Sequence, residues 1–177
     1  MIFTESILKG VFVIEPSRFE DERGFFARVW CQNEFRAQGL ETGLIQSNIG
    51  FSKHQGTLRG LHYQVSPYEE TKLVRCTRGA IFDVAVDLRL GSPSYRRWVG
   101  FNLSADNYKM VYIPTGFAHG YQTQADDTEV TYQVSQVFSP SSERGVRWND
   151  PAFGIEWPIP VPKAISTKDL NWPDYPR

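Results

Sequence analysis

The sequence predicts an all-β protein, a barrel or sandwich of antiparallel strands, and two observations carry this prediction. First, the middle of the chain is divided into short segments rich in β-branched and aromatic residues, which favour strands. Second, these segments alternate with turns that contain glycine or proline, at the short regular spacing typical of barrels and sandwiches. The chain contains 14 glycines and 11 prolines, which suits a fold with many turns.

Five strands are predicted in order along the middle of the chain, over residues 71–76, 80–88, 95–103, 109–113 and 129–138. The second (AIFDVAVDL) is mostly apolar, as in a buried strand, whereas the last alternates, with Val130, Tyr132 and Val134 on one face. The turns between them are 77–79, 91–94, 104–107 and 114–116. A short helix is predicted over residues 32–38. The segment 148–177 is dense in proline and tryptophan and is expected to extend over the barrel.

Length and composition indicate one globular domain spanning residues 1–177. Hydrophobic residues make up 41% of the chain and charged residues 22%, as in ordinary globular proteins. The formal net charge of -1 gives no sign of binding to nucleic acid or to an anionic membrane. Because the sequence has neither a membrane-spanning apolar run nor the core of a signal peptide, we expect a cytoplasmic protein in which Cys31 and Cys76 are reduced.

The three histidines are the first candidates for chemistry. His54 lies in a polar stretch that is typical of a loop. His119 ends the pattern Pro-x-Gly-x-x-His, which resembles the second motif of the cupin β-barrels. Metal-binding cupins supply two further histidines and a glutamate from a first motif, whose place is taken here by residues 59–62 (RGLH), with His62 alone. Two histidines are too few ligands for zinc or iron, so we expect neither a metal nor a cofactor.

Beyond this motif, nearly the whole chain, from Phe19 to Trp172, resembles the dTDP-4-dehydrorhamnose 3,5-epimerase family. The matching stretches occur in the family's order and at matching spacing, which makes them specific together although each is weak alone. They are 21–26 (DERGFF), 56–64 (GTLRGLHYQ), 72–75 (KLVR), 83–89 (DVAVDLR), 113–120 (IPTGFAHG), 143–148 (ERGVRW) and 166–169 (STKD). The resemblance implies a cupin-type jelly-roll barrel with a few short helices.

The resemblance also implies a reaction. The family's substrate is a nucleotide-linked 4-keto-6-deoxyhexose, in which the ketone acidifies the hydrogens on carbons 3 and 5. Removing one of them as a proton gives an enolate, and protonation of the opposite face inverts that carbon without a metal or redox cofactor. His62 matches the family's base, and Asp169 matches the carboxylate that orients it. Lys72 matches the cation beside the keto oxygen, and Tyr132 matches the acid on the far face.

Substrate-binding residues are implied in the same way. Arg23 and Arg59 match arginines that hold the diphosphate through their bidentate guanidinium groups. Phe19 and Phe26 are expected to flank the nucleobase or pack on it. In the family, the arginine matched by Arg23 reaches the site of the neighbouring subunit, so we expect a homodimer that binds a nucleotide-diphosphate sugar. The other implied ligand contacts are Gln46, Asn48, His119, Glu143 and Lys168.

The sequence departs from the family pattern at several places near these residues. Arg28 stands where many members have a glutamate that contacts the ligand region. The segment 66–71 before Lys72 lacks the usual glutamine, and residues 133–138 lack the lysine, aspartate and tyrosines that often follow Tyr132. The four reaction residues are intact, so epimerisation is expected, while the nucleotide, the sugar and the inverted carbon stay open.

Two other functions compete with epimerisation. A ketoisomerase on the same barrel needs the same acidified carbon–hydrogen bonds and is able to reuse a histidine, although the stretch 59–62 argues against it. A metal-binding or ligand-sensing cupin without catalysis requires a third histidine and a carboxylate that the motifs do not supply.

Overall fold

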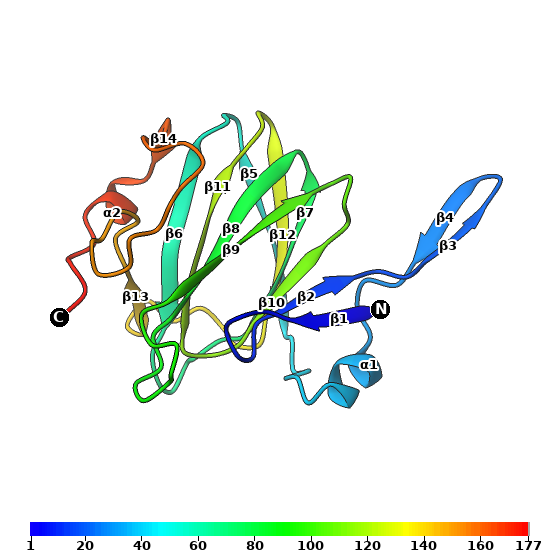
Figure 1. Cartoon of the computed structure of the whole chain (residues 1–177), viewed down its shortest axis with the longest axis horizontal. Helices are drawn as coiled ribbons and strands as arrows, with labels where there is room; N and C mark the ends of the chain where they lie inside the picture. The colour runs from blue at the N-terminus through cyan, green and yellow to red at the C-terminus, as the bar shows by residue number, and fades with distance from the viewer. Residues whose placement is uncertain (177) are drawn as a thin grey trace.

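Two antiparallel sheets face each other and form a jelly-roll barrel (Figure 1). The computed structural model describes residues 1–176. All neighbouring strands of the first sheet are antiparallel. Their order is β1 (Ile2–Glu5), β2 (Phe12–Glu15), β10 (Met110–Ile113), β7 (Lys72–Arg78), β12 (Thr128–Val134) and β5 (Gln46–Ser52). The predicted all-β jelly roll is confirmed.

The second sheet forms the other wall of the barrel. Its order is β13 (Glu143–Gly145), β6 (Thr57–Gln64), β11 (Phe117–Thr123), β8 (Ala80–Asp87) and β9 (Trp98–Ser104). The short strand β14 (Ala164–Ile165) pairs in parallel with β6, and the helix α2 (Thr167–Leu170) contacts β6 as well. The C-terminal segment therefore lies along this side of the barrel, as predicted for the proline-rich end of the chain (Figure 1).

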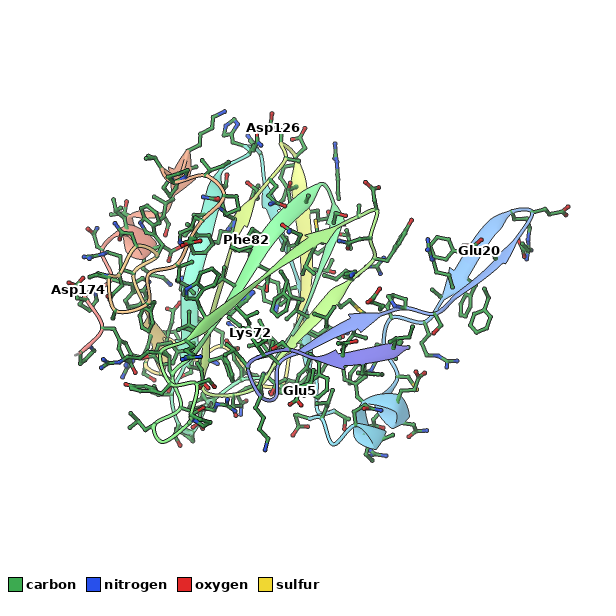
Figure 2. The ribbon with its side chains drawn as sticks, viewed as in Figure 1. Glu5, Glu20, Lys72, Phe82, Asp126 and Asp174 are labelled. Carbon is green, nitrogen blue, oxygen red and sulfur yellow. The ribbon has the colours of Figure 1, made fainter. Side chains whose placement is uncertain are left out.

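A hairpin projects from the barrel on the side opposite the C-terminal segment (Figure 1). It consists of β3 (Arg18–Asp21) and β4 (Gly24–Ala27), in which Phe19 pairs with Phe26. These two rings are 68% and 67% exposed. Figure 2 shows Glu20 on this hairpin and Lys72 within the body of the barrel. The helix α1 (Gln32–Ala37) follows the hairpin, at the place predicted from the sequence.

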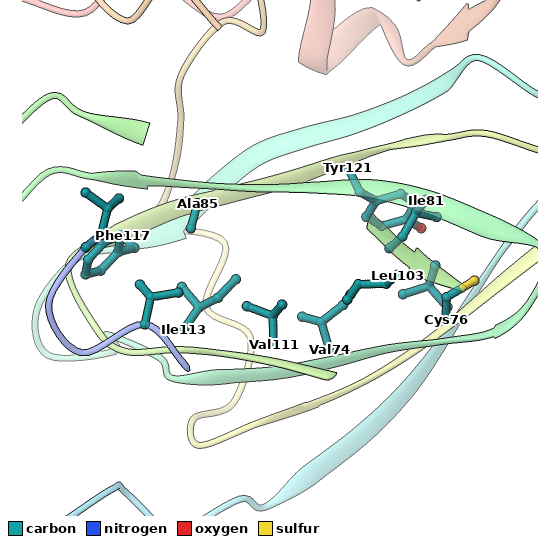
Figure 3. Packing of buried hydrophobic residues seen from close by; sticks show 12 residues of the cluster. Val74, Cys76, Ile81, Ala85, Leu103, Val111, Ile113, Phe117 and Tyr121 are labelled. Carbon is teal, nitrogen blue, oxygen red and sulfur yellow. The ribbon is translucent and has the colours of Figure 1, made fainter. Parts of the chain in front are cut away.

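Apolar side chains from both sheets pack together in one part of the barrel interior (Figure 3). Val74 and Val111 of the first sheet belong to the same buried cluster as Ile81 and Ala85 of β8. The alternate residues of β8, including Val84, pack on the other face of the second sheet in a cluster with residues of the C-terminal segment. Burial on both faces explains why the sequence of β8 is mostly apolar rather than strictly alternating.

Three strand ends differ from the prediction by two residues or more, and the others by one residue at most. β7 ends at Arg78 rather than at residue 76, because Arg78 still pairs with Glu129. The turn predicted over residues 77–79 therefore begins later than expected. β9 begins at Trp98 rather than at residue 95, since the chain turns through Arg96, whose φ is 66°. β12 ends at Val134, where its pairing with both β5 and β7 stops, rather than at residue 138.

Gly60 allows β6 and β11 to approach closely where His62 lies opposite His119. The φ of Gly60 is 108°, and an added Cβ atom meets Gly120 Cα and the His119 backbone oxygen, each at 2.7 Å. We expect Gly60→Ala to lower the free energy of unfolding by at least about 3 kcal/mol, through backbone strain and overpacking together.

Urea unfolding measures this loss, and Gly39→Ala is the matched control. Gly39 also has a positive φ, 72°, but no atom lies within 4 Å of its added Cβ. The control variant therefore carries the backbone strain alone, which costs about 1 kcal/mol. Equal losses in the two variants would show that the close approach of the strands is not what requires Gly60.

Candidate functional site

A pocket of about 640 Å³ opens within the barrel, and the C-terminal segment forms part of its wall. Most of the site residues predicted from the sequence line this pocket, although they come from seven separate parts of the chain. They are His62, Lys72, Tyr132, Asp169, Arg59, His119, Glu143, Lys168, Gln46 and Asn48. The fold thus brings together side chains that are far apart in the sequence. His62 and Asp169, for example, are hydrogen-bonded although 107 positions separate them.

His62 and Asp169 form a hydrogen-bonded pair in the pocket. His62 Nε2 lies 2.5 Å from Asp169 Oδ1. The Asp169 side chain is 5% exposed, whereas that of His62 is 31% exposed and reaches solvent through the pocket. Because a carboxylate only accepts hydrogen bonds, a neutral His62 carries its hydrogen on Nε2 and keeps the lone pair on Nδ1. A lone pair on an accessible imidazole is the feature that a general base requires.

The backbone around Asp169 holds its carboxylate toward His62. Ser166 caps the N-terminus of α2, and its hydroxyl accepts a hydrogen bond from Asp169 N at 3.0 Å. Asp169 Oδ2 accepts another from Gly60 N at 3.2 Å. Burial alone raises the pKa of a carboxyl group, but the hydrogen bonds from His62 and Gly60 outweigh it and hold the Asp169 pKa below its usual range. Asp169 is therefore ionised at neutral pH and stabilises a protonated His62.

Lys72 and Tyr132 lie on neighbouring strands of the opposite sheet. Lys72 pairs with Val134, two residues after Tyr132, so the two side chains are diagonal neighbours on one face. Burial raises the pKa of Tyr132, the negative charge of Glu70 raises it further, and Arg59 opposes the rise. The phenol consequently stays protonated at neutral pH and is able to donate a proton.

A second histidine–carboxylate pair lies beside the first. His119 Nε2 is 2.8 Å from Asp83 Oδ2, and the Asp83 side chain is completely buried. This histidine is only 10% exposed at its side chain, far less than His62. The sequence pattern singled out His119 but placed Asp83 only within a buried strand. The carboxylate fixes the orientation of His119 at the pocket wall.

Cationic side chains line the mouth of the pocket. Arg59 is exposed, and its guanidinium donates to Ser52 Oγ at 3.1 Å and to the Phe51 backbone oxygen at 2.8 Å. Lys168 Nζ lies 2.5 Å from Glu143 Oε1, with the lysine 52% exposed. Anchored arginine and lysine side chains of this kind suit the binding of a phosphate group.

The three site residues on the hairpin lie outside this pocket. Arg23 is 85% exposed and pairs with Asp21 of its own hairpin at 2.5 Å. Phe19 and Phe26 are exposed on the same hairpin. Arg28, whose role the sequence left open, donates to Glu34 Oε1 at 3.1 Å. Within one chain, these hairpin residues and the pocket do not meet.

The structure adds pocket residues that the sequence analysis did not single out. Glu70 lies beside Lys72, and Tyr121 and Phe138 also line the pocket. Burial raises the pKa of Tyr121 to about 12. Glu70 and Phe138 lie in segments 66–71 and 133–138, where the sequence departs from the family pattern, and that departure was a sequence signal for both. Tyr121 had no such signal beyond its place after the His119 motif.

Two kinds of feature are absent from the described residues 1–176. Within them, histidine, cysteine, aspartate and glutamate side chains form no group of three or more able to hold a metal ion. No helix in that range has the length and apolar character needed to cross a membrane. Cys31 and Cys76 are both free thiols.

Residues 5–176 match the family model described as dTDP-4-dehydrorhamnose 3,5-epimerase. A dTDP-4-dehydrorhamnose 3,5-epimerase from Sinorhizobium fredii is 44% identical over 98% of this chain and 89% of its own. The crystal structure of the Bacillus anthracis enzyme of that name, with TDP and PPi bound, has a TM-score of 0.94 and 38% identity, covering 98% of this chain and 99% of the other. A 3'-monoepimerase from Streptomyces bikiniensis in complex with dTDP-quinovose has a TM-score of 0.87 and 33% identity, covering 96% and 85%.

These matches extend over nearly the whole chain and agree with the fold and with the motifs that line the pocket. The chain belongs to the dTDP-4-dehydrorhamnose 3,5-epimerase family, whose members are isomerases of the epimerase type.

Proposed function

We propose that this protein inverts carbon 3, carbon 5 or both in a dTDP-linked 4-keto-6-deoxyhexose, by proton removal and return through an enolate. The observation that carries the proposal is the His62–Asp169 pair, which shares one pocket with Lys72 and Tyr132. The names of the similar proteins support the substrate class, and TDP is bound in the B. anthracis structure.

His62 begins the reaction as the general base. Its free lone pair takes the hydrogen next to the ketone as a proton, which leaves the electron pair in the enolate and makes His62 an imidazolium. Asp169 stabilises that positive charge at 2.5 Å and fixes the ring, so the charge forms beside a carboxylate already in place.

Lys72 and Tyr132 complete the reaction from the other sheet. The ammonium of Lys72 offsets the negative charge that develops on the keto oxygen. Tyr132 then gives its proton to the opposite face of the carbon, which inverts the centre. Its raised pKa keeps the phenol protonated until the enolate forms. The base and the acid therefore act from opposite walls of the pocket.

The remaining pocket residues bind the substrate. Arg59 holds the diphosphate, and Lys168 with Glu143 contacts the ligand nearby. Gln46 and Asn48 of β5 and His119 of β11 supply further hydrogen bonds to it. The pocket volume of about 640 Å³ is within the range of ordinary small-molecule sites.

We further propose a homodimer in which the hairpin of one subunit reaches the site of the other. Three observations support it: Arg23 lies outside its own pocket, Phe19 and Phe26 are exposed, and the hairpin projects from the barrel (Figure 1). Arg23 then joins Arg59 at the diphosphate, and the two phenylalanines flank the nucleobase.

Mixing two variants tests this arrangement. Arg23→Ala and His62→Ala are each expected to be nearly inactive at substrate concentrations below KM. A mixed dimer has one intact site, so random exchange of subunits should restore about a quarter of the wild-type activity. No recovery, with dimers of mixed composition verified by differential tags, would show that Arg23 serves its own subunit or none.

The proposed place of action is the cytoplasm, in deoxysugar synthesis of the rhamnose type that supplies lipopolysaccharide O-antigen. Fractionation of the source cells with a specific antibody would test it directly, and recovery with the membranes or outside the cell would contradict it.

The decisive experiment follows deuterium in heavy water. Incubation with a dTDP-linked 4-keto-6-deoxyglucose should place deuterium at carbon 3, carbon 5 or both, with inversion seen by NMR. Incorporation at both carbons indicates a 3,5-epimerase, incorporation at carbon 3 alone resembles the S. bikiniensis 3'-monoepimerase, and incorporation at carbon 5 alone indicates a 5-epimerase. CDP- and GDP-linked sugars report the nucleotide preference. No exchange with any of the three would reject the proposal, and a migrated ketone would indicate an isomerase instead.

A further inference from the structure

Glu70 is a pocket residue for which the proposed mechanism has no role. It stands in the connection between β6 and β7, inside the altered segment 66–71. Its Oε1 lies 3.0 Å from Lys72 Nζ, and the two side chains are only 13% and 11% exposed. Such a well-shielded ion pair holds its two groups more firmly than a surface pair.

The carboxylate of Glu70 is itself held in place. Its Oε2 accepts a hydrogen bond from Gln64 Nε2 at 3.3 Å. Gln64 is buried, and its side chain also donates to the backbone oxygens of Tyr68 and Val137 and accepts from Ser139 N. Glu70 is therefore a fixed negative charge, positioned by the scaffold behind Lys72.

This charge acts on Tyr132 as well as on Lys72. Tyr132 is the diagonal neighbour of Lys72, and after burial Glu70 is the largest cause of its raised pKa. Of the charged groups, Arg59 opposes that rise. The titratable groups that share the pocket with Tyr132 come from every wall: Arg59, His62, Tyr63, Glu70, Lys72, His119, Tyr121, Glu143, Lys168 and Asp169.

We propose that Glu70 is the positioning residue of the reprotonating side of the pocket. Its carboxylate fixes the Lys72 ammonium for the enolate oxygen, and its negative charge opposes the formation of a tyrosinate at Tyr132. This proposal rests on the proposed function. Lysine has a long flexible side chain, so a partner that orders it beforehand removes part of the entropic cost of stabilising the enolate.

Glu70→Gln tests the charge while keeping the size of the side chain. The inversion rate, kcat, should fall on the order of 10-fold, because Lys72 loses its fixed position, while KM changes little. The alkaline limb of the pH–kcat profile should move to lower pH, because an adjacent anion no longer disfavours the tyrosinate. NMR of ¹³Cζ-labelled tyrosine, with the Tyr132 resonance assigned by Tyr132→Phe, should show Tyr132 deprotonating at lower pH than in the wild type.

Two variants serve as controls. Glu69→Gln removes one negative charge from the adjacent, exposed residue, which lies outside the pocket, and should leave both kcat and the alkaline limb unchanged. Glu70→Asp keeps the charge and should return the alkaline limb toward the wild-type position. If Glu70→Gln alters only thermal stability, and neither kcat nor the Tyr132 titration moves, Glu70 is a structural residue and the proposal is wrong.

The wild-type enzyme separates failure of this proposal from failure of the proposed function. If the wild type exchanges no deuterium into any 4-keto sugar nucleotide, the proposed function fails. If the wild type exchanges and inverts normally, but Glu70→Gln does so with the same rate and pH profile, only the role of Glu70 fails. The Tyr132 titration by NMR needs no substrate and reports on the electrostatic part in either case.

Discussion

Replacement of His62 by alanine is expected to reduce deuterium exchange and inversion by at least about 1000-fold, since the variant lacks the base that takes the proton. His62 is the accessible partner of the pair, 31% exposed, and belongs to none of the buried hydrophobic clusters. The fold should therefore persist, with thermal unfolding close to that of the wild type. Exchange is measured by NMR in heavy water, and TDP binding is measured by calorimetry.

The matched control for this variant is His54→Ala. His54 is exposed and lies outside the pocket lining, so its loss should leave exchange unchanged. A His62→Ala enzyme that binds TDP and still exchanges at more than about a tenth of the wild-type rate would exclude His62 as the base. A loss of TDP binding together with exchange would instead indicate that the substitution disturbs the pocket.

Tyr132→Phe is expected to separate exchange from inversion. The variant still forms the enolate, because His62, Asp169 and Lys72 are untouched, but it lacks the acid on the far face. The deuteron then returns mainly from His62 on the face that lost the proton. Deuterium should enter the sugar with retained configuration, while the inverted product falls by about 100-fold or more.

Mass spectrometry counts the incorporated deuterium, and NMR coupling constants give the configuration. Tyr95→Phe is the control, since it removes a hydroxyl that contacts Tyr175 outside the pocket. Unchanged inversion by Tyr132→Phe would assign the acid to another group, for which Tyr121 on the same pocket is the first candidate. Loss of exchange along with inversion would mean that the hydroxyl is needed before the enolate forms.

The sequence predicted the middle of the fold better than its ends. β8 and β10 lie where the apolar and β-branched runs predicted strands. The strands β1 to β6 were not assigned, because several are short and exposed and their pattern gives no alternation. β11, between β6 and β8, was not assigned either, because all its residues are buried and its polar and apolar residues do not alternate. The hairpin residues in particular are almost all exposed, so no core imposes a hydrophobic period on them.

The sequence motifs predicted those pocket residues that are themselves reactive side chains, but not the contacts between them. His62 and Asp169 were matched separately, but their contact depends on the C-terminal segment, where β14 pairs with β6 and the Ser166 cap of α2 holds residue 169 beside residue 62. The role of Glu70 was not predicted, because it depends on the distances from its carboxylate to Lys72 and Gln64. The sequence shows only a charged residue in an irregular connection. Spacing along the chain does not encode such distances.

The pairing of His62 with Asp169 determines the order in which the parts of the active site form during synthesis of the chain. All strands of the two main sheets, apart from the short β14, end by Gly145, well before Asp169 is reached along the chain. During synthesis, which proceeds from the N-terminus, the barrel walls are therefore available before the carboxylate that completes the base. A newly made chain therefore has the strands of its barrel first, and the last part of its pocket wall forms together with the carboxylate, so catalytic competence depends on the C-terminal segment.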